Sequence, residues 1–294
     1  MARKIAFFDI DGTLTSEIDG SIPADTKAAI TEARANGNLM FINTGRCFQN
    51  VERRFREVGW DGYVCGCGTN IYCGGQDVLH VAQTHATTMQ LLNAARALDV
   101  DILFESRSFM AFDLSRPLHH PDAVRQYESF AHRYHNMPEN LESPNFFADK
   151  FVIWYQEEAQ LTAFRRVSDK WFDCIDRGGT FREFVPYGYS KATGIQYVLN
   201  YYHLDLSDAY ALGDSNNDLS MLSYVPHSIA MGNASPESLF TQVEYVTAKS
   251  SSGGIRQALA HYGFINEISR KYCVIYGRAD RRHQHDLFPC GKCA

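Results

Sequence analysis

The chain has 294 residues, of which 45% are hydrophobic and 21% charged, so it is long enough for about two domains of roughly 150 residues. Its 28 basic and 34 acidic side chains give a net charge of −6, which excludes the basic surface of a nucleic-acid-binding protein and a polybasic membrane anchor. No apolar run approaches the roughly 20 residues of a membrane span, and the first apolar run is too short for a signal-peptide core. We therefore expect a cytoplasmic protein with reduced cysteines and neither a nucleic-acid nor a membrane partner.

Short apolar runs bounded by polar or glycine-containing turns predict strands buried on both faces at 5–8, 39–42, 209–212 and 228–231. Apolar residues at helical spacing predict helices at 24–35, 47–58, 191–203, 217–224 and 254–262. Because strands alternate with helices, we expect an α/β fold with a doubly wound, Rossmann-like parallel sheet.

The middle of the chain, from 83 to 187, has a different pattern. It predicts helices at 86–98, 122–135 and 157–171, and strands at 102–104, 110–113, 150–155, 173–177 and 181–185. Runs of strands beside helices are typical of an α+β module on a mostly antiparallel sheet. We expect this module to be inserted into the α/β domain, with crossings near residues 82 and 188. The predicted division is therefore a core of 1–82 plus 188–268, an inserted domain of 83–187, and a tail of 269–294.

The first chemically informative segment is the end of the first strand, where Asp9 and Asp11 are followed by Gly12. In an open α/β sheet this carboxyl edge is where ligands bind. Two acids placed together there repel one another unless a cation neutralises them, and Mg²⁺ prefers such oxygen ligands. The alternative interpretation is a solvated turn like a degenerate calcium loop.

A second acidic segment follows a later strand and opens a helix, with the order Gly213-Asp214-Ser215-Asn216-Asn217-Asp218. It can bring another carboxylate to the same metal, together with polar groups at a helix N-terminus. Taken singly, Ser215 or Asp218 is equally explained as a helix cap.

Two further segments carry groups suited to phosphate. Thr44 and Gly45 follow the second strand, where the alternative is an ordinary strand-to-helix turn with a threonine cap. Arg46 comes next, and either contact with a substrate or a surface salt bridge explains it. Lys191 starts a helix, which is unfavourable for a cation unless an anion shares the site, and the alternative is a surface lysine.

These four segments, in this order at strand ends, resemble the motifs of the haloacid dehalogenase (HAD) superfamily, and D-x-D-G-T is typical of its phosphatases and phosphomutases. The inserted module of about 105 residues resembles the cap of the Cof-type (subclass IIB) phosphatases. The strand and loop at 63–72, the segment 230–234, Val246-Thr247 and Gly253-Gly254 also resemble that family. The resemblance extends from residue 4 to about residue 262.

The resemblance implies a role for each matching residue. Asp9 would be the nucleophile that forms an aspartyl-phosphate, and Asp11 would be the general acid and then the general base. Thr44 and Lys191 would hold the phosphoryl oxygens. Asp214 would bind Mg²⁺ together with the Asp9 side chain and the Asp11 main-chain carbonyl. The residues implied to support the phosphate and the metal are Gly12, Gly45, Arg46, Ser215, Asn217 and Asp218.

The predicted activity is a Mg²⁺-dependent phosphomonoesterase acting on small phosphorylated metabolites, such as sugar phosphates, in a monomer or weak homodimer. A phosphomutase that uses the same aspartyl-phosphate is the main alternative. A phosphate-sensing protein without catalysis is less well supported, because Asp11 and Lys191 are both present.

Two clusters of possible metal ligands are left over. The tail carries His283, His285, Cys290 and Cys293, whose spacing matches no known zinc finger, so we expect a tail without metal. The second cluster, Cys65, Cys67 and Cys73, is better explained as small residues in a tight strand and loop. The aromatic residues of the middle segment are expected in the core of the inserted module: Phe146, Phe147, Phe151, Trp154 and Tyr155.

Overall fold

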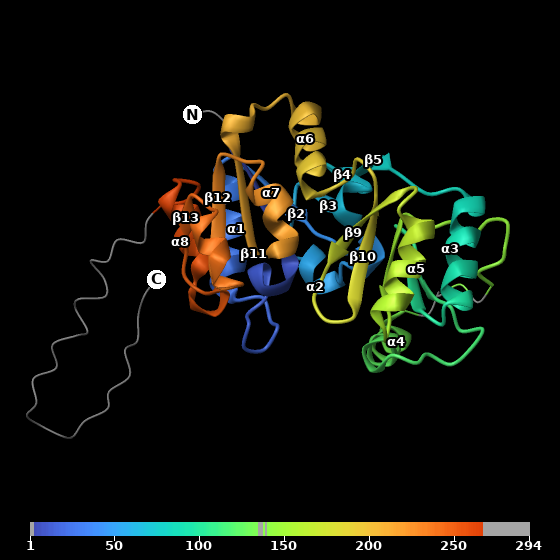
Figure 1. The fold of residues 1–294 in the computed structure, drawn as a ribbon. Coiled ribbons are helices and arrows are strands. Elements are labelled where there is room, and N and C mark those ends of the chain that lie inside the picture. Colours follow the sequence, from blue (N-terminus) through green and yellow to red (C-terminus); the bar gives the residue numbers. More distant parts are fainter. Residues whose placement is uncertain (1–2, 135–137, 139, 267–294) are drawn as a thin grey trace, which may run out of the picture.

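The computed structural model describes residues 3–134, 138 and 140–266 of the chain. These residues form two β-sheets with their helices, which lie side by side in an elongated molecule (Figure 1). The predicted tail of 269–294, with its histidine and cysteine pairs, lies outside the described residues.

The larger sheet has eight strands in the order β13-β12-β11-β1-β2-β3-β4-β5. Neighbours from β13 to β3 are parallel, whereas β4 and β5 continue the sheet as antiparallel strands. The strands are β1 (Ile5–Phe8), β2 (Leu39–Asn43), β3 (Gly62–Cys65), β4 (Asn70–Cys73), β5 (Gln76–His80), β11 (Ala209–Ser215), β12 (His227–Ser235) and β13 (Tyr245–Val246). The predicted parallel sheet is confirmed.

Helices cover both faces of this sheet because neighbouring residues of a buried strand point in opposite directions. Phe8 packs in one cluster with α1 (Ala24–Ala35) and α8 (Gly254–His261). Phe7 packs in the opposite cluster with α6 (Lys191–Tyr202) and α7 (Leu219–Leu222). Each phenylalanine is fully buried, which contributes about 2 to 3 kcal/mol relative to exposure. The sheet is therefore doubly wound, as predicted.

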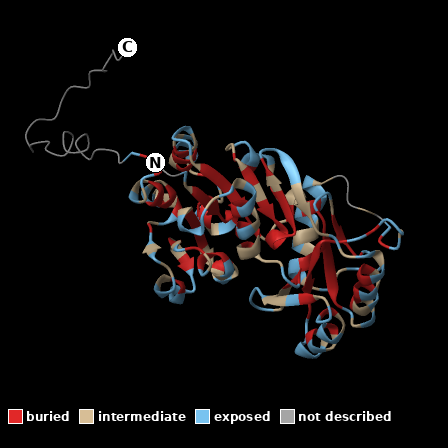
Figure 2. Cartoon of the chain, turned by 90° about the horizontal axis from the view of Figure 1, so that it is seen from above, coloured by how far each residue is buried: buried red, intermediate tan, exposed pale blue. Residues whose placement is uncertain are grey.

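The second sheet is antiparallel, with the order β7-β6-β8-β10-β9. Helices α3 (His85–Ala97) and α5 (Glu158–Ser168) pack on one face, and α4 (Pro121–Arg133) packs on the other. Its strands are β6 (Asp101–Glu105), β7 (Met110–Phe112), β8 (Lys150–Trp154), β9 (Phe172–Asp176) and β10 (Phe181–Pro186). The inserted α+β module is therefore confirmed as a sheet of its own, and in both sheets the strands are largely buried (Figure 2).

The aromatic residues of this module lie mainly in its core. Phe151 stacks on Phe184 at 4.7 Å between ring centroids, and Phe146, Trp154 and Tyr155 are also buried. Phe147 is the exception, with 39% of its surface exposed. Cys65, Cys67 and Cys73 are buried free thiols in or between β3 and β4.

The chain passes between the two sheets through residues 81–84 and 187–190, beside the predicted crossings near 82 and 188. We propose that these connections separate the core from the cap, as we call the inserted module from here on. Within the described ranges, every helix is either too short or too polar for a bilayer span.

Two predicted helices are wrong in part. The predicted helix 47–58 is a short turn at Phe48–Asn50 followed by the four-residue helix α2 (Arg53–Arg56). Val51 and Glu52 between them are extended, because the Val51 side chain is fully buried and the Glu52 carboxylate pairs with three arginines. The predicted helix 217–224 likewise shortens to α7 after a turn at Asn216–Asp218, and strands β5 and β13 were not predicted.

Candidate active site

Strand β1 ends directly at the site, with Asp9 as the first residue after it. The Asp9 amide donates to the Leu212 carbonyl at 3.1 Å, which holds Asp9 beside strand β11, and its side chain is almost completely buried. The chain then turns at Gly12, where φ is +80° and an added Cβ would lie 2.1 Å from Asp214 Oδ2. Only glycine fits there, because it tolerates both this backbone conformation and the close carboxylate.

Asp214 and Asp218 come from the end of strand β11 and the turn after it. One oxygen of the fully buried Asp218 accepts hydrogen bonds from the main-chain amides of Asp214 (2.9 Å) and Ser215 (3.1 Å). The Asp214 carboxylate accepts a hydrogen bond from Thr13 Oγ1 at 3.0 Å. Asp218 therefore fixes the loop that carries Asp214, and Thr13 connects that loop to the first acidic turn.

Lys191, the first residue of α6, joins the two acidic segments. Its side chain is 1% exposed, and Nζ donates to Asp9 Oδ1 at 2.6 Å and to Asp218 Oδ1 at 2.5 Å. Burial alone would lower the pKa of Lys191, but the two carboxylates raise it above its ordinary value. The Ser190 hydroxyl oxygen accepts a hydrogen bond from the Thr193 amide and so caps the helix. The start of α6 therefore does not need the Lys191 side chain, which reaches the two acids instead.

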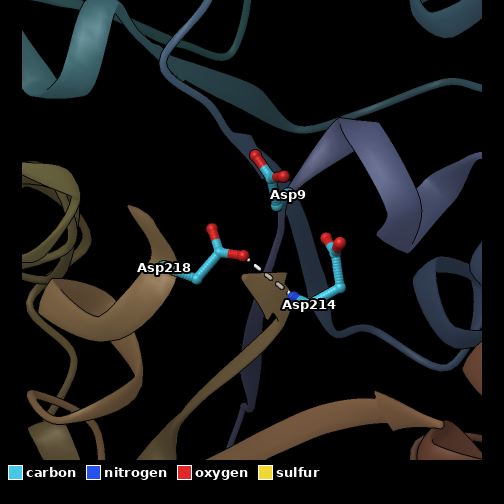
Figure 3. Close-up of side chains that lie close together, drawn as sticks. All are labelled: Asp9, Asp214 and Asp218. Atoms are coloured by element: carbon cyan, nitrogen blue, oxygen red, sulfur yellow. Dashed lines mark hydrogen bonds between the residues drawn. The ribbon is translucent and has the colours of Figure 1, made fainter. Parts of the chain in front are cut away.

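Three carboxylates gather here against this one lysine. Oxygens of Asp9, Asp214 and Asp218 all lie within 4.8 Å of one another (Figure 3). Burial, followed by the charge of Asp218, raises the pKa of Asp9 to about 7. Burial, followed by the charges of Asp9 and Asp218, raises the pKa of Asp214 to about 8. Such oxygen donors with unbalanced negative charge fit a hard divalent cation.

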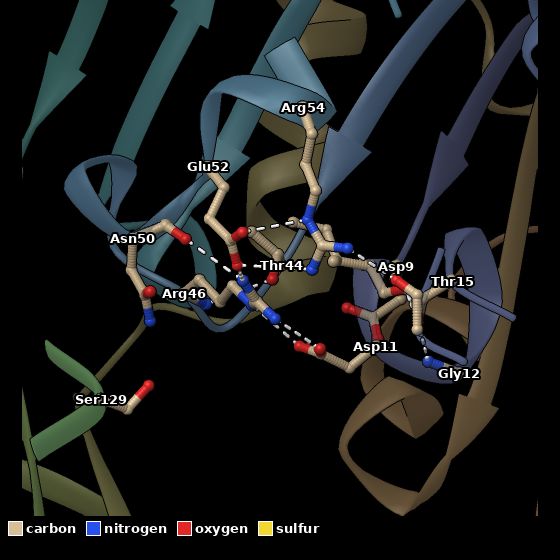
Figure 4. Close-up of polar contacts among 12 residues, drawn as sticks. Asp9, Asp11, Gly12, Thr15, Thr44, Arg46, Asn50, Glu52, Arg54 and Ser129 are labelled. Atoms are coloured by element: carbon tan, nitrogen blue, oxygen red, sulfur yellow. Dashed lines mark hydrogen bonds and ion pairs between the residues drawn. The ribbon is translucent and has the colours of Figure 1, made fainter. Parts of the chain in front are cut away.

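The predicted metal ligands were the side chains of Asp9 and Asp214 and the main-chain carbonyl of Asp11, and the structure brings the two side chains together. The Asp11 side chain, for which the resemblance implied the acid–base role, is 63% exposed and pairs with Arg46 (Figure 4). Asp218, one of the residues implied to support the metal, is the third carboxylate of the acidic cluster and also pairs with Lys191. The roles assigned to these residues remain predictions.

The segment Thr44 to Arg46 directly follows strand β2, which lies next to β1 and ends at the same edge of the sheet. Thr44 is 1% exposed, its amide donates to the Val64 carbonyl, and its Oγ1 accepts the Arg46 amide at 3.2 Å. At Gly45 an added Cβ would lie 3.2 Å from a carboxylate oxygen of Glu183, so the small residue lets the cap come close. Arg46 lines the cavity and forms an ion pair with Asp11, and its contact with a substrate stays a prediction.

A cavity of about 340 Å³ lies between the two sheets and is lined by Asp9, Thr44 and Arg46, among others. Its core wall has Asp9, Asp11, Thr44, Gly45, Arg46, Asn50, Ser215 and Asn217. Its cap wall has Glu105, Gln126, Phe130, Arg133, Lys150, Val152, Arg177, Phe181 and Glu183. The Ser215 hydroxyl donates to the Asn217 side-chain oxygen at the rim. Of the predicted site residues, Gly12, Asp214, Lys191 and Asp218 do not line this cavity but contact or adjoin residues that do.

The sequence did not predict a group of buried charged residues on the cap wall of the cavity. Lys150 is 2% exposed, and its Nζ lies 2.8 Å from both Glu105 and Glu183. Arg177 lies 3.6 Å from Glu183 on the other side. A signal existed, because charged residues stand beside apolar runs in these strands: Glu105 ends β6, Lys150 begins β8 and Glu183 lies within β10. Buried charges of this kind are retained only when they are paired.

A family model described as haloacid dehalogenase-like hydrolase matches residues 6–259. The chain belongs to this family. Among curated proteins it is similar to "Putative phosphatase YkrA" of Bacillus subtilis, with 28% identity over 90% of this chain and all of that protein. Among solved structures it is similar to a hypothetical protein of Geobacillus kaustophilus, with 26% identity, a TM-score of 0.77, and coverage of 90% of this chain and all of the other.

The fold of this haloacid dehalogenase-like chain, with its separate cap sheet, is also similar to a second solved structure. The fold matches that of BT4131, which is described as a sugar phosphatase of subclass IIB, with a TM-score of 0.75 at 24% identity. That match covers 89% of this chain and all of BT4131. The core sheet, the separate antiparallel cap sheet and the family match together establish a haloacid dehalogenase-like hydrolase.

Proposed function

We propose that the protein is a Mg²⁺-dependent phosphomonoesterase that hydrolyses small phosphorylated metabolites through an aspartyl-phosphate. The observation that carries this proposal is the buried Asp9 carboxylate, held at 2.6 Å by Lys191 on the floor of a cavity shared with the cap. A nucleophile needs such fixed orientation and a site that excludes bulk water.

In the first half-reaction an Asp9 carboxylate oxygen attacks phosphorus, and the bond from phosphorus to the ester oxygen breaks. The leaving oxygen takes a proton from Asp11, which is the exposed carboxyl group on the same cavity wall. In the second half-reaction Asp11 takes a proton from water, the water oxygen attacks phosphorus, and the bond to Asp9 breaks. Inorganic phosphate and the original Asp9 and Asp11 are the result.

The surrounding residues offset the charge that moves during these steps. Lys191 and the Thr44 hydroxyl donate toward the phosphoryl oxygens in this proposal. Asp9 and Asp214 would hold Mg²⁺, with Asp218 beside them. When bound, the ion supplies the positive charge that lets an anionic carboxylate approach an anionic phosphate.

The cap wall supports a hydroxyl-rich leaving group, such as a sugar. Glu105 and Glu183 offer acceptor oxygens, whereas Gln126 and Arg177 offer donors. The apolar part of the wall, Phe130, Val152 and Phe181, suits the carbon faces of a small ring. The cavity of about 340 Å³ limits the leaving group to the size of a small metabolite.

The test measures inorganic phosphate released from a panel of phosphorylated metabolites, with Mg²⁺ and with EDTA. We expect hydrolysis of a few compounds that EDTA abolishes and added Mg²⁺ restores. Asp9→Asn should remove turnover while the fold is kept, and Asp205→Asn, at an exposed aspartate away from the cavity, should not. Residual Asp9→Asn turnover within about tenfold of wild type would contradict the assignment. Formation of a phosphorylated isomer without phosphate release would instead indicate a mutase.

A further inference from the structure

A chain of ion pairs connects the cap to Asp11. Asp11 receives two hydrogen bonds from Arg46, from Nε at 2.9 Å and from Nη2 at 2.5 Å. The third nitrogen of Arg46, Nη1, lies 3.4 Å from Glu52 Oε1. The same Glu52 oxygen accepts a hydrogen bond from Arg133 Nη1 at 3.0 Å, and Arg133 is the last residue of the cap helix α4. Figure 4 shows the residues of the core that take part in these ion pairs.

A second contact joins the same two places. The Tyr134 hydroxyl donates to Asn50 Oδ1 at 3.1 Å, and Arg46 Nη1 donates to the Asn50 carbonyl at 3.2 Å. The segment Asn50 to Glu52 thus receives the end of α4 on one side and Arg46 on the other. The extended backbone at Glu52, which interrupts the helix expected from the sequence, puts its carboxylate between the two arginines.

The planar guanidinium group of Arg46 lets its contact with Glu52 set the direction of its contact with Asp11. Its five donors lie in one plane in a fixed fork, so the direction of Nη1 sets the direction of the edge that binds Asp11. Arg46 is 18% exposed and Glu52 is 24% exposed, so solvent screens their interaction only in part. Asp11, at 63% exposure, depends on Arg46 for its orientation, because no other residue among those described donates a side-chain hydrogen bond to its carboxylate.

We propose that Arg133 is a positioning residue: with α4 seated on Asn50 to Glu52, it fixes Glu52 and Arg46, and thereby orients Asp11 for proton transfer. The cap thus contributes to the acid–base step through a core ion pair as well as through its cavity wall. This inference rests on the proposed function, in which Asp11 is the acid–base residue. Glu52 does not line the cavity, so its effect on catalysis can reach the substrate only through other residues.

The test compares two substrates that differ in their need for a general acid. p-Nitrophenolate leaves as a stable anion without a proton, whereas the alkoxide of an alkyl phosphate needs one. kcat/KM includes only the steps up to loss of the leaving group, so later hydrolysis of the aspartyl-phosphate does not enter. The measured quantity is therefore the ratio of kcat/KM for the fastest alkyl phosphate of the panel to kcat/KM for p-nitrophenyl phosphate.

Glu52→Gln is the decisive variant, and we expect it to lower this ratio about tenfold, as a partial loss of a general-acid effect of about 10²- to 10⁴-fold. Arg133→Gln should lower it similarly, Arg133→Lys should restore part of it, and the double variant should be no worse than either single one. Arg54→Gln is the matched control, since Arg54 also pairs with Glu52, at 2.9 Å, but touches neither Asp11 nor the cap. It should leave the ratio within about twofold of wild type.

Two outcomes separate the inference from the function beneath it. If Asp11→Asn lowers the ratio but Glu52→Gln leaves it unchanged, the positioning role is refuted and the acid–base role stands. The same conclusion holds if the effects of the Glu52 and Arg133 variants multiply in the double variant. If Asp11→Asn also leaves the ratio unchanged, Asp11 is not the general acid and both fail. Circular dichroism and thermal unfolding check that each variant is folded, and Arg133→Gln provides the test if Glu52→Gln is not.

Discussion

Gly12 is the residue whose replacement tests the acidic cluster most directly. In Gly12→Ala the new methyl carbon would lie 2.1 Å from Asp214 Oδ2, whereas ordinary contacts begin at 3.4 Å. The Asp214 carboxylate must therefore move by more than an ångström, or the turn after Asp9 must open. The backbone adds strain of about 1 to 2 kcal/mol, because φ is +80° and an L-residue rarely adopts it.

The expected result is a large loss of activity with a modest loss of stability. Mg²⁺ demands near-ideal ligand geometry, and a misplacement of about 1 Å at a catalytic group can cost about 10²-fold. We therefore expect kcat/KM to fall about 100-fold and the Mg²⁺ concentration for half-maximal activity to rise. Phosphate release over a Mg²⁺ titration and urea unfolding in EDTA measure the two effects separately.

Gly37→Ala provides the matched control. Gly37 has φ of +88° just after helix α1, and nothing lies within 4 Å of its added Cβ. It should lose the same 1 to 2 kcal/mol or so through strain alone, with unchanged activity. A Gly12→Ala enzyme with the activity and the Mg²⁺ dependence of Gly37→Ala would refute the inference that Asp214 must stay where it is.

The other predictions concern the two buried lysines and their acids. Lys191→Met leaves the buried carboxylates of Asp9 and Asp218 without a cation. We expect kcat to fall by about 10²- to 10³-fold and the free energy of unfolding, measured in EDTA, to fall by about 3 to 5 kcal/mol. An unfolding curve like that of wild type would contradict this expectation. Burial raises the pKa of Glu183, but Lys150 and then Arg177 outweigh it and lower that pKa to about 2 from an ordinary 4.5. A carboxyl group whose pKa is lowered by folding stabilises the fold above pH 4.5, and this stabilisation is lost as the pH falls toward 2. Glu183→Gln should therefore lower the free energy of unfolding by about 3 kcal/mol at pH 7 and by progressively less below pH 4.5. Urea unfolding of both proteins from pH 7 to pH 3 checks this, and a pH-independent difference would show that charge is not the cause.

Much of the fold follows from the sequence because local pattern decides it. Fully buried parallel strands must be apolar on both faces, which is why 5–8 and 209–212 could be recognised as strands. The helix predicted at 47–58 failed because its local spacing is helical, while the contacts of Val51 and Glu52 with distant parts of the chain favour an extended backbone. Sequence pattern alone carries no information about those partners.

The same distinction applies to the site. The sequence by itself determined which residues end the strands, and the carboxyl edge of a parallel sheet then brings Asp9, Thr44 and Asp214 to one region. Only the tertiary structure decided which side chains meet there. Lys191 reaches Asp9 across 182 positions of sequence, Arg46 pairs with the Asp11 side chain, and Lys150 pairs with two glutamates across the cap sheet. Strand ends are set by local apolar pattern, whereas the pairing of buried charges is set by packing between segments far apart in the chain, because each charge must find a partner wherever the fold places it.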